Sequence, residues 1–533
     1  MDSSFLWWRD GVIYQIYPRS FADSNGDGIG DLPGIQSKLD YLVDLGVDAL
    51  WLSPVYPSPD VDFGYDVADY TDIDPKYGTL ADFDSLVEAA HQRGLRIVMD
   101  LVLNHSSDQH PWFIQSRSSR DNPYRDWYIW RDPAPGKRPP NGWQSVFGGK
   151  AWEWDEATGQ YYYHMFCREQ PDLNWRNPRV RQAILDVFRF WMERGVDGFR
   201  LDVFNVYFKD DQLRENPRRL GRRPFDSQVH LYDCDRPEMI PLLQEIRALL
   251  DSYPERYAVG ETFLSTTSKA AGYARPGLLH AAFDFSFLAC KWDPAAFLKT
   301  IQAIDSQYSQ DGWPTYVLGN HDVDRIATRY AHGEDDERLK VLAALLLTQR
   351  GTPFIYQGDE IGMRNVHVPR AEMKDPVGLR YWPMPVGRDG ERSPMQWSGG
   401  AHAGFTSGTP WMRLHANAPI RHVESQRTRP DSLFHVYRRL LRLRKELPAL
   451  RGGMFLPLNY EPRSLLAYLR KDEGQTVLVA LNFSRRRNRL VLGGGLARSG
   501  WRLAYSSKRA EFTAPRDSSL LLEPYEALIL VQQ

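Results

Sequence analysis

The chain has 533 residues, 42% of them hydrophobic, and a formal net charge of −2, as expected of a large folded protein with an ample core. It has no basic run typical of nucleic-acid binding and no stretch of about 18 apolar residues that would span a membrane, so neither partner is expected. The start, MDSSFLWWRDGV, lacks the basic segment of a secretory signal. Because Cys167, Cys234 and Cys290 match no zinc spacing, we expect free thiols and a cytoplasmic location.

Short apolar runs alternate with amphipathic segments from residue 10 to about 360. The first three runs, GVIYQIYPRS (11–20), VDALWLSP (47–54) and LRIVMDLVLNH (95–105), predict strands. Helices are expected between them at 32–46 and 79–94. In the second helix, Thr79 and Asp82 form a Thr-x-x-Asp start signal.

The alternation is interrupted at residues 104–172, which are rich in Trp, Pro, Gly and Tyr and predict a domain inserted after the third strand. It resumes with a helix at 180–195 and five further strand candidates, at 196–203, 257–263, 281–287, 314–322 and 352–358. Eight strands alternating with helices predict an α/β fold, the (β/α)8 or TIM barrel.

The C-terminal part has a different pattern. Residues 362–430 show no clear period and are expected to form loops over the barrel, before a helix at 434–450 and strands at 464–470, 476–484 and 527–533. The predicted domains are the first part of the barrel (1–103), the inserted B domain (104–172), the second part with its lid loops (173–453) and a C-terminal antiparallel β-sandwich (454–533).

Polar residues follow four of the predicted strands, at the ends where TIM barrels carry their active sites. Arg200 and Asp202 project to the same side of a strand, and a guanidinium beside a carboxylate is expected to lower its pKa and keep it anionic. Glu261 follows an apolar run, which favours a raised pKa and a role as a general acid. The four strand ends carry Asn104 and His105, Arg200 and Asp202, Glu261, and Asn320, His321 and Asp322.

Four of these segments resemble the signature regions of glycoside hydrolase family 13, the α-amylase superfamily, in the family's order and with similar spacing: DLVLNH (100–105), GFRLDV (198–203), GETF (260–263) and GNHD (319–322). The resemblance implies that Asp202 is the nucleophile and Glu261 the acid/base, with Asp322 stabilising the transition state. It also implies that Arg200, His105 and His321 hold the sugar in subsite −1. Retaining chemistry predicts that the two catalytic carboxyls lie about 5–5.5 Å apart.

Three further segments are similar to the oligo-1,6-glucosidase and α-glucosidase branch of that family: DFGYDVADY (62–70), QPDLNW (170–175) and ERSPMQW (391–397). By this resemblance Asp62 and Arg392 close the non-reducing end of subsite −1, and Tyr65 stacks on the sugar ring. Such a dead-end pocket predicts an exo-acting enzyme. The candidates for its wall are Phe147, Phe166 and Gln170 from the inserted domain.

Two signals for the linkage preference conflict. Val203, directly after the nucleophile, favours α-1,6 bonds in this branch, whereas FNVYFKDDQLRENP (204–217) looks more like α-glucosidases of short α-1,4 substrates and sucrose. The preference between α-1,4, α-1,6 and sucrose-type substrates stays open, as does the oligomeric state.

An Asp- and Gly-rich loop follows the first strand and places oxygen donors at alternate positions, as in the first nine positions of an EF-hand loop. Gly34 stands where the acidic twelfth residue is expected. Related α-glucosidases carry a similar loop, so one structural Ca²⁺ or Mg²⁺ is expected. No organic cofactor is expected, because Pro33 replaces the third glycine of a dinucleotide fingerprint. The candidate ligands are Asp23, Asn25, Asp27, the carbonyl of Ile29, and Asp31.

Three functions are compatible with these features. The first is an exo-acting retaining α-glucosidase that releases glucose from short α-glucosides and also transfers glucosyl groups. The second is a trehalose synthase or sucrose isomerase of the same branch, although VDRIATRY (323–330) lacks the charged signature expected of the latter. The third, a catalytically inactive hydrolase-like binding subunit, is disfavoured because all three carboxyls are present.

Overall fold

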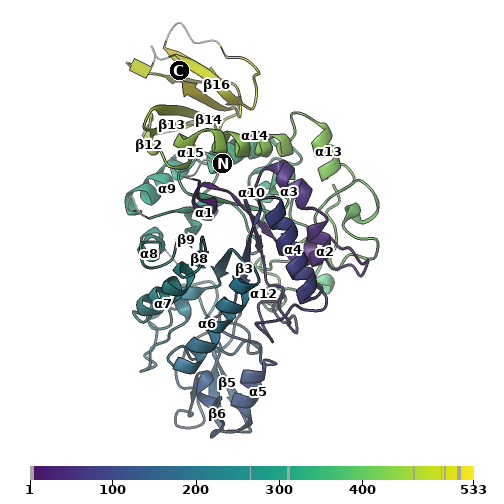
Figure 1. Cartoon of the computed structure of the whole chain (residues 1–533). Coiled ribbons are helices and arrows are strands. Elements are labelled where there is room, and N and C mark those ends of the chain that lie inside the picture. The colour runs from purple at the N-terminus through teal and green to yellow at the C-terminus, as the bar shows by residue number, and fades with distance from the viewer. Residues whose placement is uncertain are drawn as a thin grey trace.

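The computed structural model describes residues 5–264, 266–308, 312–459, 463–493, 495–496, 500–512 and 518–533. Figure 1 shows a central barrel with a lobe at each end. The lower lobe in that view contains β5, β6 and α5 from the inserted segment, and the upper lobe contains the C-terminal strands.

The eight central strands pair in parallel in the order β10-β11-β1-β2-β3-β7-β8-β9. The two ends of this sheet approach each other, since Thr315 Oγ1 on β10 donates to Ala282 O on β9 at 3.2 Å. The barrel prediction and its eight strands are therefore confirmed. Their bounds are β1 (Ile13–Ile16), β2 (Ala49–Leu52), β3 (Arg96–Leu101), β7 (Gly198–Leu201), β8 (Tyr257–Glu261), β9 (Ala281–Phe283), β10 (Thr315–Val317) and β11 (Thr352–Tyr356).

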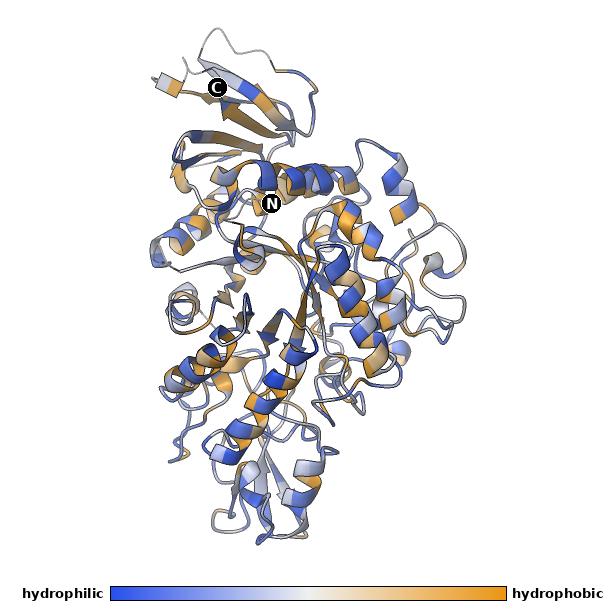
Figure 2. Cartoon of the chain, viewed as in Figure 1, coloured by the Kyte–Doolittle hydropathy of each residue, from blue (hydrophilic) through white to orange (hydrophobic). Residues whose placement is uncertain are grey.

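Helices surround this sheet and turn their apolar sides towards it, as the alternating colours along α4 and α6 indicate (Figure 2). The Thr79–Asp82 start signal is confirmed as a reciprocal capping box. The single helix predicted at 32–46 is instead two, because Lys38 leaves helical geometry (φ −108°, ψ 4°). The helices are α1 (Trp7–Asp10), α2 (Leu32–Gln36), α3 (Leu39–Leu45), α4 (Leu80–Gln92), α6 (Pro178–Glu193), α7 (Met239–Asp251), α8 (Thr267–Tyr273), α9 (Pro294–Gln307), α10 (Ile326–Tyr330), α11 (Glu337–Leu347), α14 (Leu433–Glu446) and α15 (Pro448–Arg451).

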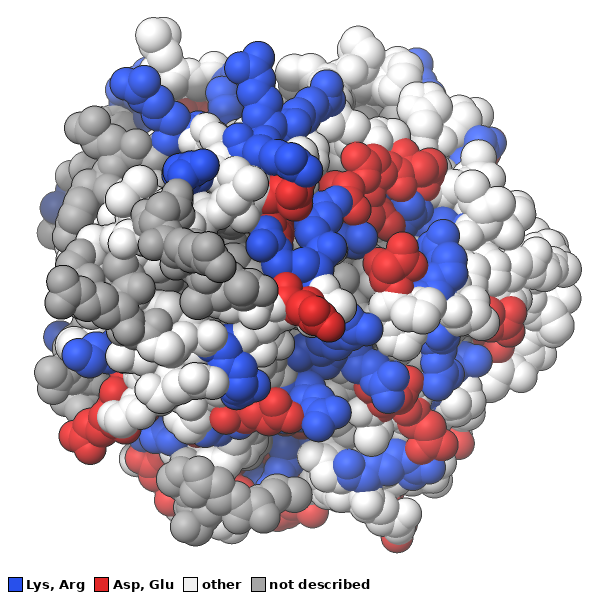
Figure 3. Space-filling view, turned by 90° about the horizontal axis from the view of Figure 1, so that it is seen from above, with Lys and Arg blue, Asp and Glu red and all other residues white. Residues whose placement is uncertain are grey.

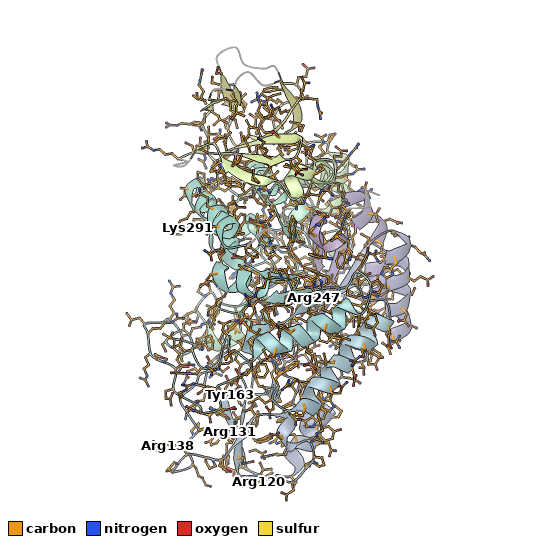
Figure 4. The ribbon with its side chains drawn as sticks, turned by 60° about the vertical axis from the view of Figure 1, so that its left-hand side comes forward. Arg120, Arg131, Arg138, Tyr163, Arg247 and Lys291 are labelled. Carbon is orange, nitrogen blue, oxygen red and sulfur yellow. The ribbon has the colours of Figure 1, made fainter. Side chains whose placement is uncertain are left out.

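The inserted segment forms α5 (Pro111–Ser118) and a small antiparallel sheet in the order β4-β6-β5, with β4 (Trp130–Arg131), β5 (Trp152–Asp155) and β6 (Gln160–Tyr163). Figure 4 labels Arg120, Arg131, Arg138 and Tyr163 in this lobe. A buried cation joins the lobe to the barrel: Lys209 Nζ donates to Asn104 Oδ1 at 2.7 Å and to the Asp172 carboxylate.

The C-terminal lobe contains two antiparallel sheets, β12-β13-β14-β18-β16 and β15-β17. A buried leucine-rich cluster includes residues of both sheets, among them Leu478 and Leu522. Sequence periodicity located three of these strands. The full set is β12 (Met454–Pro457), β13 (Leu465–Asp472), β14 (Gln475–Asn482), β15 (Asn488–Val491), β16 (Trp501–Ser506), β17 (Ser519–Leu522) and β18 (Ala527–Gln532). On the face seen from this end, acidic and basic side chains intermingle (Figure 3).

The segment expected to form lid loops is mainly irregular, with only short helices such as α12 (Pro376–Tyr381) and α13 (Val423–Thr428). It folds back onto the barrel mouth, where Arg388 and Arg392 both pair with Asp322, in the segment that follows β10. Within the described ranges, no helix combines the length and apolarity needed to cross a bilayer.

Candidate active site

One guanidinium connects three carboxyl groups at the mouth of the barrel. Arg200 Nη1 donates to Asp100 Oδ1 at 2.6 Å and to Asp202 Oδ1 at 2.7 Å, and its Nη2 donates to the Glu261 carboxylate. Only 2% of the Arg200 side chain is exposed, so these charges interact with little solvent screening. The ends of β3, β7 and β8 thus bring the predicted nucleophile and acid/base together, and they add Asp100, which sequence reasoning had not singled out.

Burial raises the pKa of Asp202 well above its usual range; Arg200 opposes this shift, while Glu261, Asp100 and Asp322 add to it. The expectation that Arg200 would leave this pKa depressed is therefore wrong. The reason is that one guanidinium is shared by three carboxyls in a site that excludes water.

Tyr65 and His321 lie face to face beside this cluster, with ring centroids 5.4 Å apart and an interplanar angle of 5°. The Tyr65 hydroxyl lies 2.7 Å from His321 Nε2 and donates to Asp100 Oδ2 at 3.0 Å. On the other side of the imidazole, Gln15 Nε2 lies 2.6 Å from Nδ1. Burial lowers the pKa of His321 to about 3, so it is a neutral group that fixes the Tyr65 ring.

The Asp–Arg pair expected at the closed end of the pocket has a different arginine. Arg388 Nη2 donates to Asp62 Oδ1 at 2.8 Å, and Arg388 Nη1 lies 3.2 Å from Asp322 Oδ1. Asp375, which is fully buried, holds the same guanidinium through Nε at 2.8 Å. The predicted partner, Arg392, does not pair with Asp62, and the prediction is corrected on this point.

Arg392 instead lies behind Asp322. Its Nη2 donates to Asp322 Oδ1 at 2.8 Å and its Nε donates to the His321 carbonyl at 2.9 Å. Burial alone would raise the pKa of Asp322, but the positive charges around it, those of His321 when it is protonated and of Arg388 and Arg392, bring it well below the usual range. Because His321 is neutral near pH 7, the two arginines are what keep Asp322 anionic.

His105 and Gln170 form the floor between the barrel and the inserted lobe. His105 Nε2 lies 2.9 Å from the Tyr65 carbonyl, and Gln170 Nε2 donates to the same carbonyl at 3.0 Å. Gln170 Nε2 also lies 3.3 Å from Asp62 Oδ2. Burial lowers the pKa of His105 to about 4. His105 therefore holds Tyr65, and Gln170 holds both Tyr65 and Asp62, through hydrogen bonds of neutral groups.

Phe147 and Phe166 meet edge to face with centroids 5.5 Å apart. The Arg388 guanidinium lies 5.1 Å from the centre of the Phe147 ring, and His105 lies 5.2 Å from Phe166. Both rings also line a cavity of about 520 Å³ between the inserted lobe and α12. Phe147 thus lies beside Arg388 and Phe166 beside His105, while both rings also line that cavity.

Val203 adopts a left-handed backbone conformation (φ 36°, ψ 39°) directly after Asp202. A β-branched residue rarely takes this conformation, which stores about 1–3 kcal/mol of strain. The Val203 side chain is buried, and its N–H lies 3.4 Å from Glu261 Oε2. The turn therefore places Asp202 next to Glu261.

The loop expected to bind a cation is held by its own hydrogen bonds. Asp23 Oδ1 accepts from Asn25 N at 2.9 Å, and Asp31 Oδ2 accepts from Ser24 N at 3.0 Å. Thr406 Oγ1 donates to the Asp23 carboxylate. Asp27 accepts from Ile29 N at 2.8 Å and is exposed. Among the described residues, no three His, Cys, Asp or Glu side chains gather to hold a metal ion. The oxygen donors nevertheless have the chemistry that Ca²⁺ and Mg²⁺ prefer.

The barrel with its cluster of carboxyl and guanidinium groups is consistent with the family comparison. The family model described as "Alpha amylase, catalytic domain" matches residues 15–453. The chain belongs to the α-amylase family. A second model, "Maltogenic Amylase, C-terminal domain", matches residues 455–529 of this α-amylase family member. The predicted family is thereby confirmed.

Several relatives match this family member over nearly their full length. A probable α-glucosidase of Rhizobium meliloti is 45% identical over 90% of this chain and 89% of its own, and an oligo-1,6-glucosidase of Parageobacillus thermoglucosidasius is 42% identical over 90% and 91%. The crystal structure of an α-glucosyl transfer enzyme superposes with a TM-score of 0.93 at 41% identity, covering 99% of this chain and 100% of the other.

Proposed function

We propose that this protein is an exo-acting retaining α-glucosidase that releases glucose from the non-reducing end of short α-glucosides. The observation that carries the proposal is the joint contact of Arg200 with Asp202 and Glu261. In the first step an Asp202 oxygen attacks the anomeric carbon, and Glu261 gives its proton to the departing glycosidic oxygen. In the second step water attacks the glucosyl-enzyme, its proton goes to Glu261, and Asp202 leaves as a carboxylate.

The exo mode follows from the Asp62–Arg388 pair. Both groups are largely buried, with 6% and 14% of their side chains exposed, and both carry polar atoms of the kind that bond hydroxyls. Asp322, anionic and linked to Arg388, supplies negative charge beside the developing oxocarbenium ion. A longer glucan would have to displace this pair to extend past subsite −1, so one glucose leaves per cycle.

Transfer of the glucosyl group to another sugar is a second outcome of the same intermediate. The similarity to an α-glucosyl transfer enzyme supports this activity, and an isomaltulose synthase from Erwinia rhapontici NX5, 35% identical with a TM-score of 0.90, supports an isomerase as the alternative. Incubation with maltose, isomaltose, sucrose and trehalose separates them. Free glucose as the main product supports the glucosidase, new disaccharides with little glucose support the isomerase, and no turnover contradicts both.

We also propose that the loop at residues 23–31 binds one structural Ca²⁺ or Mg²⁺. The support is the oxygen-only donor set of the loop. A saturating ion at about 100 times its Kd would stabilise the fold by about 2.7 kcal/mol. Thermal unfolding in EDTA, with Ca²⁺ or with Mg²⁺, tests this for the wild type and Asp27→Ala. A Tm that is equal in EDTA and in both ions contradicts it.

We also propose a cytoplasmic location. Its support is chemical: Cys167, Cys234 and Cys290 are all unpaired, as in proteins of reducing compartments. Fractionation of the native host with an antibody against the chain tests this.

A further inference from the structure

The turn that follows Asp202 touches the segment that carries Glu261 at several points. Beyond Val203 N, which faces Glu261 Oε2, the Phe204 ring lies against Gly260, where an added Cβ would come within 2.5 Å of Phe204 Cδ1. Gly260 therefore has to be glycine for β8 to lie this close to the turn. The segments that follow β7 and end β8 are therefore in direct van der Waals contact.

Asn205 makes the most specific of these contacts. Its Nδ2 donates to the Phe263 carbonyl at 2.9 Å, and its Oδ1 accepts from Phe263 N at 2.7 Å. One carboxamide thus binds both polar groups of a single backbone residue two positions after Glu261. The pair requires a donor and an acceptor on the same planar group, which Asn supplies and Asp does not.

A further hydrogen bond, to a residue other than Phe263, also holds the Asn205 carboxamide. Its Nδ2 also donates to Asp235 Oδ1 at 2.9 Å, and Asp235 is in turn bound by Lys269 and by the Tyr273 hydroxyl, which lies at 3.1 Å. Asn205 is fully buried. Its rotamer is therefore set by groups on both sides, as needed for a side chain that positions another.

We propose that Asn205 is a positioning residue that sets where the Glu261 carboxyl lies relative to Asp202. The inference rests on the proposed function, in which Glu261 protonates the leaving-group oxygen. It assigns Asn205 no contact with substrate. Its effect is confined to the position of the proton donor, so it should change the step that needs a proton more than the step that does not.

Leaving groups of different basicity provide the test. In Asn205→Ala, kcat/KM for maltose, whose departing oxygen needs the Glu261 proton, should fall about 10- to 100-fold, the cost of a misplacement of about 1 Å. For α-glucosyl fluoride, whose fluoride leaves without protonation, kcat/KM should change little. Asn205→Asp keeps the side-chain shape and the acceptor but loses the donors, and should show the same selective loss if the alanine variant folds poorly.

Asn216 provides the matched control, because it is a buried Asn in the same loop whose Nδ2 donates to Asp233 Oδ2 at 2.9 Å and whose Oδ1 accepts from Leu231 N at 3.1 Å. Asn216→Ala should lower Tm without distinguishing the two substrates. Equal losses on both substrates in both Asn205 variants would overturn the inference, as would no loss.

Glu261→Gln separates this inference from the function on which it rests. That variant should lose maltose turnover and still react with α-glucosyl fluoride to form the glucosyl-enzyme. If it distinguishes the two substrates and the Asn205 variants do not, the positioning role alone is wrong. If Glu261→Gln loses both reactions equally, the acid/base assignment is wrong and the inference about Asn205 is overturned with it.

Discussion

Arg388 lies between two carboxyls that the sequence had placed in different parts of the pocket, with Nη2 2.8 Å from Asp62 Oδ1 and Nη1 3.2 Å from Asp322 Oδ1. The same guanidinium therefore joins Asp62, at the proposed closed end of subsite −1, to the proposed transition-state stabiliser. A planar fork with two terminal nitrogens makes both contacts at once, which a lysine ammonium does not.

Arg388→Lys should lower kcat/KM for maltose by about 100-fold, because the charge remains but one of the two carboxyls loses its partner. Steady-state kinetics measure this. Arg413→Lys is the control: Arg413 pairs with Glu372 in the same long segment, with 45% of its side chain exposed, and its loss should leave kinetics unchanged. Equal behaviour of the two variants would contradict the corrected Asp62–Arg388 pair.

The acid limb of the pH profile should report Asp202. Since burial raises its pKa and the nucleophile acts as a carboxylate, kcat/KM should fall on acidification at a higher pH than the value of about 3.9 expected for a free Asp. The proposed mechanism fixes the sign: below its pKa Asp202 is protonated, and a protonated carboxyl would not attack the sugar.

Asp100→Asn should move that limb to lower pH, because Asp100 is one of the charges that raise the pKa of Asp202 and a competitor for Arg200. Profiles of kcat/KM for the wild type and the variant measure the shift. Asp359→Asn, a buried carboxyl at the end of β11 whose Oδ2 accepts from Tyr356 N, is the control and should leave the limb in place. A limb that moves to higher pH in Asp100→Asn would count against the electrostatic account.

Lys209→Met should destabilise the contact between the inserted lobe and the barrel. It leaves the buried Asp172 carboxylate without its cation, at a cost of about 3–5 kcal/mol. Urea unfolding should show a lower midpoint, and adding Asp172→Asn should recover part of the loss. The exposed Lys299→Met should stay within about 0.5 kcal/mol of wild type. A Lys209→Met protein as stable as Lys299→Met would show that the buried pair contributes nothing.

The periodicity of apolar residues in the sequence was sufficient to predict the barrel. Its strands are buried apolar runs and its helices carry one apolar face, as in β3 and α4. It was weaker for the C-terminal lobe. Among the described residues of this lobe, β15 and β17 pair only with each other, and β16 has a register shift between Leu503 and Tyr505. Strands of that kind carry too little pattern to be recognised without their partners.

In the candidate active site, too, some residues could be predicted from the sequence and others could not. Asp202 and Glu261 lie at the ends of apolar strands and Asp322 lies in the segment that follows β10, so their convergence followed from the fold. Arg388 and Arg392 lie four residues apart in an irregular segment, and nothing local says which of them reaches Asp62. The sequence did not indicate a role for Asp100 for a related reason. Asp100 lies within the apolar run of β3, and its place in the site becomes evident only from its ion pair with Arg200.

The most direct test of the account is to identify the residue that carries the glucosyl group. Glu261→Gln incubated with α-glucosyl fluoride should accumulate a covalent glucosyl-enzyme, because glycosylation needs no proton and hydrolysis lacks its base. Peptide mapping of the quenched protein by mass spectrometry should place the added glucosyl group on Asp202. A label on any other residue would contradict the central claim, as would release of β-glucose without a covalent intermediate.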